Sequence, residues 1–208
     1  MLWAMETHKD DIPEQQKLIL ATTSPYRLGI FKNLWIHFIS EGSEVDEYTS
    51  DRPTEPEELT QYLAKLKAEA VAQNHKTWIV VWFDTVGYFD GEILEKPKTR
   101  EMAYTRLKSL SGKSFTYTTG IHAINLDTQQ TISRTAQTEV YMRAYTDQEI
   151  DFYLDNCNEA YKTHAHGFNP ENYYSMSFIE KIVWDPNGVV GVPLWEIMNV
   201  LTEIWHHI

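Results

Sequence analysis

Short apolar runs and helical stripes alternate along the first half of the chain. Apolar runs at 17–22, 36–42 and 77–83 predict short buried strands, and the residues at 55–73 predict an amphipathic helix. The polar stripe of that helix recurs at helical spacing: Glu58, Gln61, Lys65, Glu69 and Gln73. Strands and helices therefore alternate from the start of the pattern.

Longer alternating runs follow in the second half. A turn at Asp90-Gly91 predicts a hairpin, and the runs at 115–126, 131–145 and 175–184 predict further strands. Helices are predicted at 99–110, 146–154 and 193–205. Because helices and strands alternate first and hairpins follow, we expect an α/β fold in which helices flank a mixed β-sheet.

Composition places these elements in a single compact body. The chain has 208 residues and 42% hydrophobic residues, which is ordinary for a globular protein, and it contains no repeat or Ser/Gly-rich linker. Residues 1–16 mix charged and polar side chains and are expected to be a flexible extension. The folded domain is expected to span residues 17–208.

Charge and cysteine content exclude several classes of protein. The formal net charge of -12 repels nucleic acid and anionic lipid, so we expect neither partner. The longest apolar run, Trp78 to Phe83, is far below the roughly 20 residues that span a bilayer, and the N-terminus offers no secretory signal. Cys157 is the single cysteine, which excludes an internal disulfide. A cytoplasmic location is expected.

The turn between the first strand and the first helix is a candidate phosphate site. Ser24 is placed to cap the helix by accepting a backbone N–H, and Pro25 suits the first helical position. A helix N-terminus after a buried strand binds phosphate, Thr22 and Ser24 add hydroxyl groups, and Arg27 can contact phosphate oxygens in a fork. An ordinary capped helix with a surface arginine is the alternative.

Two charged residues interrupt apolar patterns. Lys67 projects from the apolar side of the helix at 55–73, either to extend its stem over the core edge or to meet an anion. Asp84 follows the buried run at a strand end, where ligands bind in α/β folds. Burial of its charge calls for a metal, a lysine or a water, and Lys96 near the adjacent hairpin is one candidate. Turn capping is the alternative for Asp84.

Two further groups are weaker candidates. Glu44, Asp46 and Glu47 form an acidic loop that is either solvated or part of a magnesium-binding cleft. His164 and His166 would share one face of a strand, but two imidazoles without a third ligand are a weak zinc signal.

In this order the segments resemble the Maf family of nucleoside triphosphate pyrophosphatases, from about Lys17 to Leu201. The matching segments are LILATTSPYR, SEVDEY, AKLKAEAVA, FDTVGYFDGEILEKP, LKSLSGKSFTYTTGI, TEVYMRAYTDQEIDFYL and VVGVPL. The resemblance implies two lobes around a central cleft, a homodimer, and a nucleoside triphosphate hydrolysed to a monophosphate and pyrophosphate.

The resemblance also implies residue roles. Ser24 and Arg27, with Thr22 in the same turn, would hold phosphates, and Lys67 and Lys96 would clamp the triphosphate. Asp84 would be the general base and, with Glu47, would bind a divalent cation, Mg²⁺ or Mn²⁺. Thr85 is the residue expected of a dTTP/UTP branch, and Asn169 is a candidate nucleotide contact.

Departures from the family pattern keep alternatives open. Tyr26 after Ser24-Pro25 and the turn at 185–187 are typical of a branch associated with 7-methyl-GTP, in contrast to Thr85. The segment at 161–172 retains only Gly167 of a glycine-containing stretch, so a non-catalytic nucleotide-binding protein is a second hypothesis. A haloacid-dehalogenase-type phosphatase is a third, although Val86 stands where that family needs a second acid.

Overall fold

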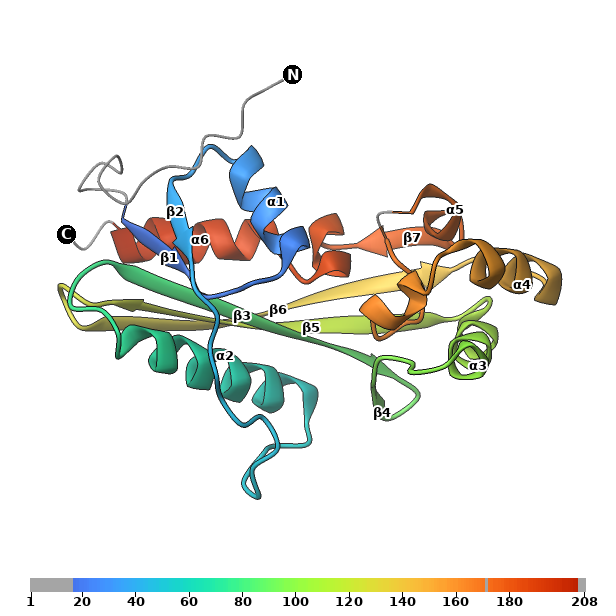
Figure 1. Cartoon of the computed structure of the whole chain (residues 1–208), viewed down its shortest axis with the longest axis horizontal. Coiled ribbons are helices and arrows are strands. Elements are labelled where there is room, and N and C mark those ends of the chain that lie inside the picture. Colours follow the sequence, from blue (N-terminus) through green and yellow to red (C-terminus); the bar gives the residue numbers. More distant parts are fainter. Residues whose placement is uncertain (1–16, 171, 206–208) are drawn as a thin grey trace. The chain divides into compact units, whose positions relative to one another are not determined.

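The computed structural model describes residues 17–170 and 172–205. The extension expected at 1–16 lies outside the described residues. A seven-stranded sheet has the order β2-β1-β3-β5-β6-β7, with β4 paired to β3. Strand β1 pairs in parallel with β2 and β3, whereas β4 and β7 pair antiparallel with β3 and β6. The predicted α/β fold with a mixed sheet and flanking helices is therefore confirmed (Figure 1).

The elements follow the predicted order. The strands are β1 Leu18–Leu20, β2 Phe38–Ser40, β3 Ile79–Phe89, β4 Glu92–Leu94, β5 Ser114–Asn125, β6 Gln130–Met142 and β7 Ile179–Val183. The helices are α1 Pro25–Asn33, α2 Pro56–Ala72, α3 Arg100–Leu110, α4 Asp147–Asn156, α5 Tyr173–Met176 and α6 Leu194–Trp205, with short 3-10 helices η3 Ala160–Thr163 and η4 Pro186–Val190.

The chain divides into two compact units. The first comprises the described residues of Met1–Asp84, Thr119–Ala136 and Val190–Ile208, and the second comprises Thr85–Thr118 and Gln137–Val189. Strands β3, β5 and β6 contribute residues to both. The cleft between two lobes that the family resemblance implies stays a prediction.

The first unit has helices on both faces of its strands. Helices α1 and α6 lie on one face and α2 on the other (Figure 1). Residues of β3 alternate between the two cores: Phe83 packs with Phe31 of α1, and Trp82 packs with the alanines of α2. Helix α2 approaches β5 so closely that a Cβ at Gly120 would overlap the backbone carbonyl of Thr60. Glycine is thus required at this contact.

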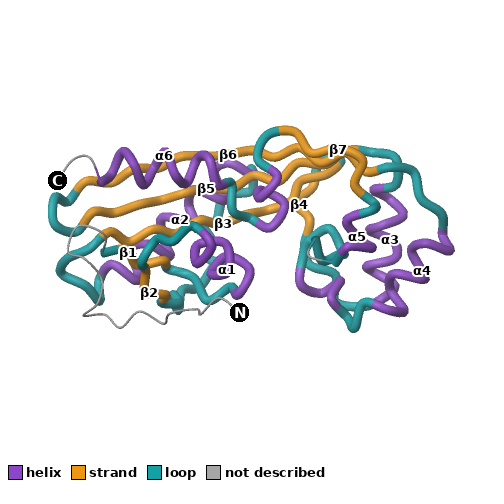
Figure 2. Tube along the Cα trace, turned by 90° about the horizontal axis from the view of Figure 1, so that it is seen from above, coloured by secondary structure: helices purple, strands orange, loops and turns teal. Residues whose placement is uncertain are grey.

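The second unit has its own core around helices α3 and α4. Helices α3, α4 and α5 lie together (Figure 2), and Leu107, Tyr153, Phe168 and Phe178 are among the buried residues packed there. The prediction of a strand over 175–184 is wrong at its start, because Asn172 caps α5 by accepting from the N–H groups of Tyr174 and Ser175. The strand itself begins at Ile179.

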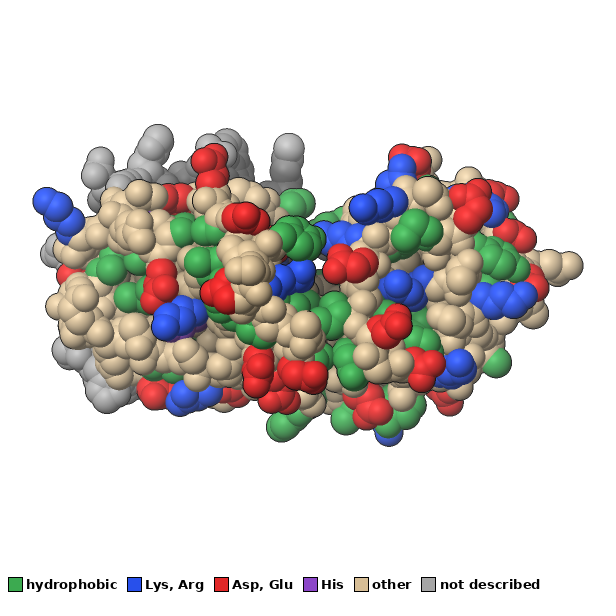
Figure 3. All heavy atoms as spheres, turned by 90° about the horizontal axis from the view of Figure 1, so that it is seen from below, with side chains coloured by type: hydrophobic (Ala, Val, Ile, Leu, Met, Phe, Trp, Pro, Cys, Tyr) green, Lys and Arg blue, Asp and Glu red, His purple; other side chains and the backbone are tan. Residues whose placement is uncertain are grey.

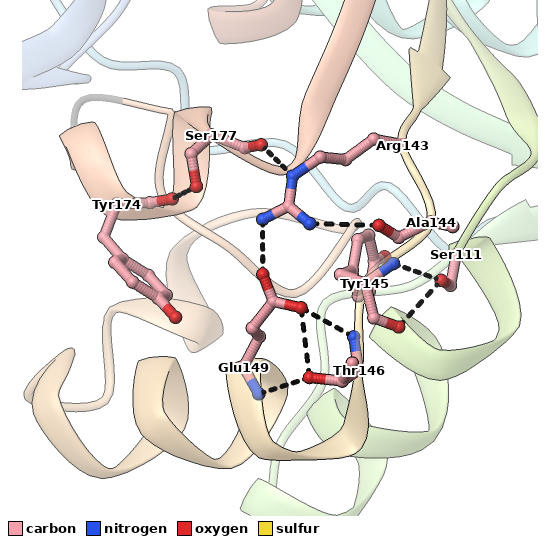
Figure 4. A network of polar contacts seen from close by, with 8 residues as sticks. All are labelled: Ser111, Arg143, Ala144, Tyr145, Thr146, Glu149, Tyr174 and Ser177. Atoms are coloured by element: carbon pink, nitrogen blue, oxygen red, sulfur yellow. Dashed lines mark hydrogen bonds and ion pairs between the residues drawn. The ribbon is translucent and has the colours of Figure 1, made fainter.

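A polar network fixes the N-terminus of α4. The Thr146 and Glu149 side chains form the reciprocal capping box, and Arg143 Nη2 donates to Glu149 Oε1 at 2.7 Å (Figure 4). Arg143 also donates to the carbonyls of Ser177 and Ala144, at 2.6 and 3.0 Å. Main-chain and arginine donors lower the pKa of Glu149 to about 2. This network joins α4, β6 and the segment that precedes β7.

Candidate active site

The turn from β1 into α1 has the predicted strand-turn-helix form. Pro25 is the first helical residue and Ser24 is the N-cap, but the prediction that the Ser24 side chain caps the helix is wrong, because it makes no such hydrogen bond. Instead, Thr22 is buried and its Oγ1 accepts the N–H of Ser24 at 3.1 Å. The hydroxyl of Thr22 therefore holds the turn, and the hydroxyl of Ser24 is not used as a cap.

Arg27 extends from the first turn of α1 to the end of the buried part of β3. Its Nη1 donates to the carbonyl oxygen of Phe83 at 2.6 Å, and its guanidinium lies 4.9 Å from the centre of the Phe83 ring. Burial lowers the pKa of Arg27, and the negative charge of Asp84 acts in the opposite direction. A guanidinium has five N–H donors, so an arginine that donates to one carbonyl through Nη1 keeps donors for an anion.

Lys67 and two carboxylates form an ion cluster in the first unit. Lys67 is buried, with 6% of its surface exposed, and its Nζ lies 2.6 Å from Asp84 Oδ1 and 2.8 Å from Glu47 Oε1. Asp84 is thus the kind of anionic partner expected for Lys67, and Lys67 is the lysine companion expected for Asp84. Lys96, the companion suggested by sequence, belongs to the second unit.

The acidic loop contributes one of its three acids to this cluster. Only Glu47 pairs with Lys67. Asp46 accepts the N–H of Tyr48 through Oδ1 at 2.9 Å, which is an Asx turn, and Glu44 is exposed. Local turn formation by Asp46 thus directs its neighbour Glu47 toward α2.

The ion cluster fits a divalent cation. One ammonium nitrogen is within 2.8 Å of both carboxylates, so the site already supports positive charge between Asp84 and Glu47. Mg²⁺ is commonly held by one or two carboxylates and by substrate phosphates. No group of three or more His, Cys, Asp or Glu side chains that could hold a metal occurs in the described part of the chain.

Comparison with known proteins identifies the family of this chain. A family model for Maf-like proteins matches residues 17–204. A dTTP/UTP pyrophosphatase of Alkaliphilus metalliredigens (strain QYMF) is 35% identical over 192 residues, which cover 92% of this chain and 97% of that protein. The chain belongs to the Maf family.

Similarity to solved structures is lower. The match to the Ham1 protein of Staphylococcus aureus covers 61% of this chain and 71% of the Ham1 chain, with 18% identity and a TM-score of 0.41. The match to protein VC0702 of Vibrio cholerae covers 78% of this chain and 90% of the Vibrio cholerae chain, with 13% identity and a TM-score of 0.36. Both TM-scores are too low to support an inference, so membership of the Maf family depends on the sequence matches.

The remaining residues expected from the Maf resemblance belong to the second unit. Thr85 follows Asp84 in β3 and begins this unit, and Lys96 is exposed between β4 and α3. Asn169 is half-buried, with its N–H donating to Tyr153 Oη at 3.0 Å and its carbonyl accepting from Ser175 Oγ at 2.5 Å. The substrate-binding roles of these three residues stay predictions.

The altered segment at 161–172 is packed rather than extended. The prediction of a strand with both histidines on one face is wrong, because His164 follows η3 and the chain then turns. His166 is fully buried, packs against Phe168, and hydrogen-bonds to the Tyr117 hydroxyl. Burial holds the pKa of His166 well below its usual value. A neutral histidine thus serves as a core residue of this Maf protein.

Two aromatic residues of the site were missed by sequence reasoning. The Trp82 ring centre is 5.3 Å from Lys67 Nζ, and Phe83 supports Arg27 on the other face of β3. The available signal was strand alternation, because Trp82 lies two residues before Asp84 and shares its face.

The expected absence of nucleic-acid and membrane partners stays a prediction. On the face drawn in Figure 3, acidic and basic side chains are interspersed rather than gathered by sign. Among the described helices, none combines the length and apolar character needed to cross a membrane.

Proposed function

We propose that this Maf protein is a nucleoside triphosphate pyrophosphatase that cleaves its substrate between the α and β phosphates. The observation that carries the proposal is the cluster of Lys67, Asp84 and Glu47, with Arg27 bound to the carbonyl of the preceding residue, Phe83. It combines cations suited to phosphate oxygens with a carboxylate suited to accept a proton. The name of the 35% identical relative supports the same reaction class.

The proposed chemistry is a displacement by water. Asp84 accepts a proton from the water while the water oxygen bonds to the α phosphorus. At the same time the bond from that phosphorus to the oxygen that bridges to the β phosphorus breaks. The products are a nucleoside monophosphate and pyrophosphate. Lys67 and Arg27 neutralise charge on the phosphates and orient them, which is the main requirement of phosphoryl transfer. Lys67 Nζ lies 2.6 Å from Asp84 Oδ1, and we propose that the ammonium turns toward phosphate when substrate binds.

A divalent cation, Mg²⁺ or Mn²⁺, is part of the proposal. Asp84 and Glu47 would hold it, and the phosphates would complete its coordination. When bound, the cation would supply further neutralisation of phosphate charge. Lys96, Ser24 and Thr22 are proposed to contact phosphates as well.

Two substrate classes are supported by different residues. Thr85 and the relative's name favour dTTP and UTP. Tyr26 favours a modified guanine nucleotide such as 7-methyl-GTP, because the family branch associated with that substrate has an aromatic residue after Ser-Pro. Asn169 is proposed to contact the nucleotide in either case. We place dTTP and UTP first because the relative's similarity extends over 92% of the chain.

A nucleotide-binding protein without turnover is the second candidate function. It is favoured by the segment at 161–172, where Tyr161, His166 and Phe168 are buried in the core. This packing fixes a segment that is glycine-containing in the family pattern. The ion cluster favours catalysis, because a binding protein has no need of a base at Asp84.

Product analysis separates the two candidates. The purified protein is incubated with dTTP, UTP, 7-methyl-GTP and the canonical triphosphates, with Mg²⁺, Mn²⁺ or a chelator. Release of pyrophosphate and monophosphate in equal amounts, dependent on the cation, is expected. Binding of a nucleotide by calorimetry without release across the panel would favour the binding protein.

Assembly and location complete the proposal. We expect a cytoplasmic location from the sequence composition, and a homodimer because the Maf resemblance implies one. Light scattering coupled to size-exclusion chromatography would give about twice the mass of 24.3 kDa for a dimer. A mass near that of one chain would contradict this part of the proposal alone.

A further inference from the structure

Two consecutive aromatic residues precede Asp84 in β3, and each faces one cation of the candidate site. Trp82 packs in the core under α2 and lies below Lys67, whereas Phe83 packs in the core with α1 and lies below Arg27. The alternation of a strand accounts for the opposite faces. The two cations on opposite faces of β3 therefore both lie over aromatic rings.

Lys67 needs such support because its position is costly. Its neighbours three and four residues away on α2 are the buried Ala64 and Val71, and only 6% of its own surface is exposed. A buried ammonium must recover its lost hydration from nearby groups. Asp84 and Glu47 provide two contacts, and the face of the Trp82 ring, 5.3 Å from Nζ, provides a third that is not ionic.

The indole N–H of Trp82 does not explain why a tryptophan stands at this position. Its Nε1 is buried and has no hydrogen-bond partner among the described residues. An unpaired buried N–H is unfavourable, and a phenylalanine would fill much of the same space without it. What the indole adds over a phenyl ring is a larger face, which makes tryptophan the best cation–π partner.

We propose that Trp82 is a positioning residue that holds the Lys67 ammonium beside Asp84 and Glu47. The ring restricts the long side chain to the side of β3 that carries Asp84. An aliphatic residue of similar bulk would pack under α2 but would not attract the charge.

The consequence for catalysis rests on the proposed function. If phosphates and a divalent cation engage the two carboxylates, Lys67 shares or loses those contacts, whereas the ring face of Trp82 stays in place. Trp82 then keeps the ammonium within reach of phosphate while its partners change. Its loss is expected to raise KM more than it lowers kcat.

The first test uses the ligand-free protein and needs no activity. Hydrogen exchange of the Lys67 ammonium is followed by ¹⁵N NMR, with its signal assigned by its absence in Lys67→Met. We expect exchange to be about tenfold faster in Trp82→Leu and about two- to threefold faster in Trp82→Phe, which keeps an aromatic face. Equal exchange in Trp82→Leu and the unmodified protein would overturn the proposal.

Trp78→Leu is the matched control. Trp78 lies in the same core cluster, has the same 8% exposure as Trp82, and faces Lys17 instead of Lys67. Lys67 exchange in this variant should be unchanged. A rise as large as in Trp82→Leu would overturn the proposal, because loss of packing alone would then account for the effect.

A second measurement keeps the shape of the core and does not depend on folding of Trp82→Leu. Fluorinated tryptophan is incorporated at all seven tryptophan positions, with one, two or three fluorines on each ring. Each added fluorine weakens the attraction of the ring for a cation. Exchange at Lys67 should rise with each fluorine in the unmodified sequence and stay constant in Trp82→Phe. No trend in the unmodified sequence would overturn the proposal.

A double-mutant cycle connects the proposal to nucleotide binding. Trp82→Leu should weaken binding of a non-hydrolysable triphosphate about tenfold in the unmodified protein and have little effect in Lys67→Met. Equal losses in both backgrounds would contradict an action through Lys67. Absence of pyrophosphatase activity in the unmodified protein, together with altered Lys67 exchange in Trp82→Leu, would refute the proposed function and leave the role of Trp82 supported.

Discussion

The ion cluster of the first unit and the polar network of the second both pair basic residues with glutamate, but their surroundings differ. Glu149 is held by Arg143, by the N–H of Thr146 and by the Thr146 hydroxyl. Asp84 and Glu47 are instead held through one shared ammonium. Main-chain donors cannot leave without unfolding the helix cap, whereas a lysine side chain can move.

This difference indicates which carboxylates can exchange partners. The network at Arg143 joins secondary-structure elements and leaves no chemical role for Glu149. The cluster at Lys67 holds two acids through one side-chain ammonium, and Arg27 binds the carbonyl of Phe83, the residue before Asp84. A cation and phosphates can therefore replace the contacts of Lys67. A buried ion pair does not in general stabilise a fold by much, so the burial of Lys67 is better explained by a role in function than by a role in stability.

The largest expected effect is the loss of turnover in Asp84→Asn. The amide cannot accept the proton of the attacking water, so kcat should fall by at least about 100-fold. Nucleotide binding should remain measurable by calorimetry, because Lys67 and Arg27 are retained. The matched control is Glu149→Gln, which makes the same acid-to-amide change in the other network and should keep its turnover. Equal turnover in Asp84→Asn and the unmodified protein would remove Asp84 from its role.

Lys67→Met is expected to have the next largest effect, on affinity. Loss of one charged phosphate contact should weaken nucleotide binding about 10- to 100-fold. The fold should persist because methionine fills the apolar surroundings, and because the Asp84 and Glu47 side chains keep 14% and 40% of their surface exposed to water. Thermal unfolding and calorimetric titration measure the two properties separately. A variant that fails to fold would show that Lys67 is structural.

Arg143→Met is the counterpart of that variant in the second unit. It removes hydrogen bonds to Glu149 and to the carbonyls of Ser177 and Ala144, and should lower the free energy of unfolding by about 2 kcal/mol. Nucleotide affinity should change less than in Lys67→Met. If both variants affect affinity and stability alike, the contrast between the two networks is wrong.

The smallest expected effect concerns acid stability. The pKa of Glu149 is about 2, below its ordinary value, so its ionised form stabilises the fold above that ordinary value. This contribution is lost as the pH falls from about 4.5 toward 2. Unfolding midpoints of Glu149→Gln should therefore differ from those of the unmodified protein at pH 6 and converge with them near pH 2. A constant difference across this range would contradict the assignment.

Local patterns predicted the elements, and long-range contacts decided the site. The apolar stripe of α2 predicted that Lys67 points inward, and the apolar run of β3 predicted Asp84 at the end of its buried part. The pairing between them joins different elements, so sequence could not distinguish Lys67 from Lys96 as the companion of Asp84. Family resemblance, not periodicity, supplied the proposed chemistry.

Errors arose where a side chain had a competing local partner. Ser24 is placed at the N-cap, yet Thr22 accepts the N–H that holds the turn. Asp46 turns to its own backbone, which leaves Glu47 as the acid for Lys67. His166 is buried among aromatic rings that come from distant parts of the sequence. Spacing alone cannot resolve such competition.

Paramagnetic broadening by Mn²⁺ in the presence of a non-hydrolysable triphosphate tests the central claim most directly. The account predicts that carboxyl ¹³C signals of Asp84 and Glu47 broaden first, while that of Glu149 stays sharp. Broadening at Glu149 without broadening at Asp84 would contradict the claim that the cluster around Lys67 is where cation and phosphates bind.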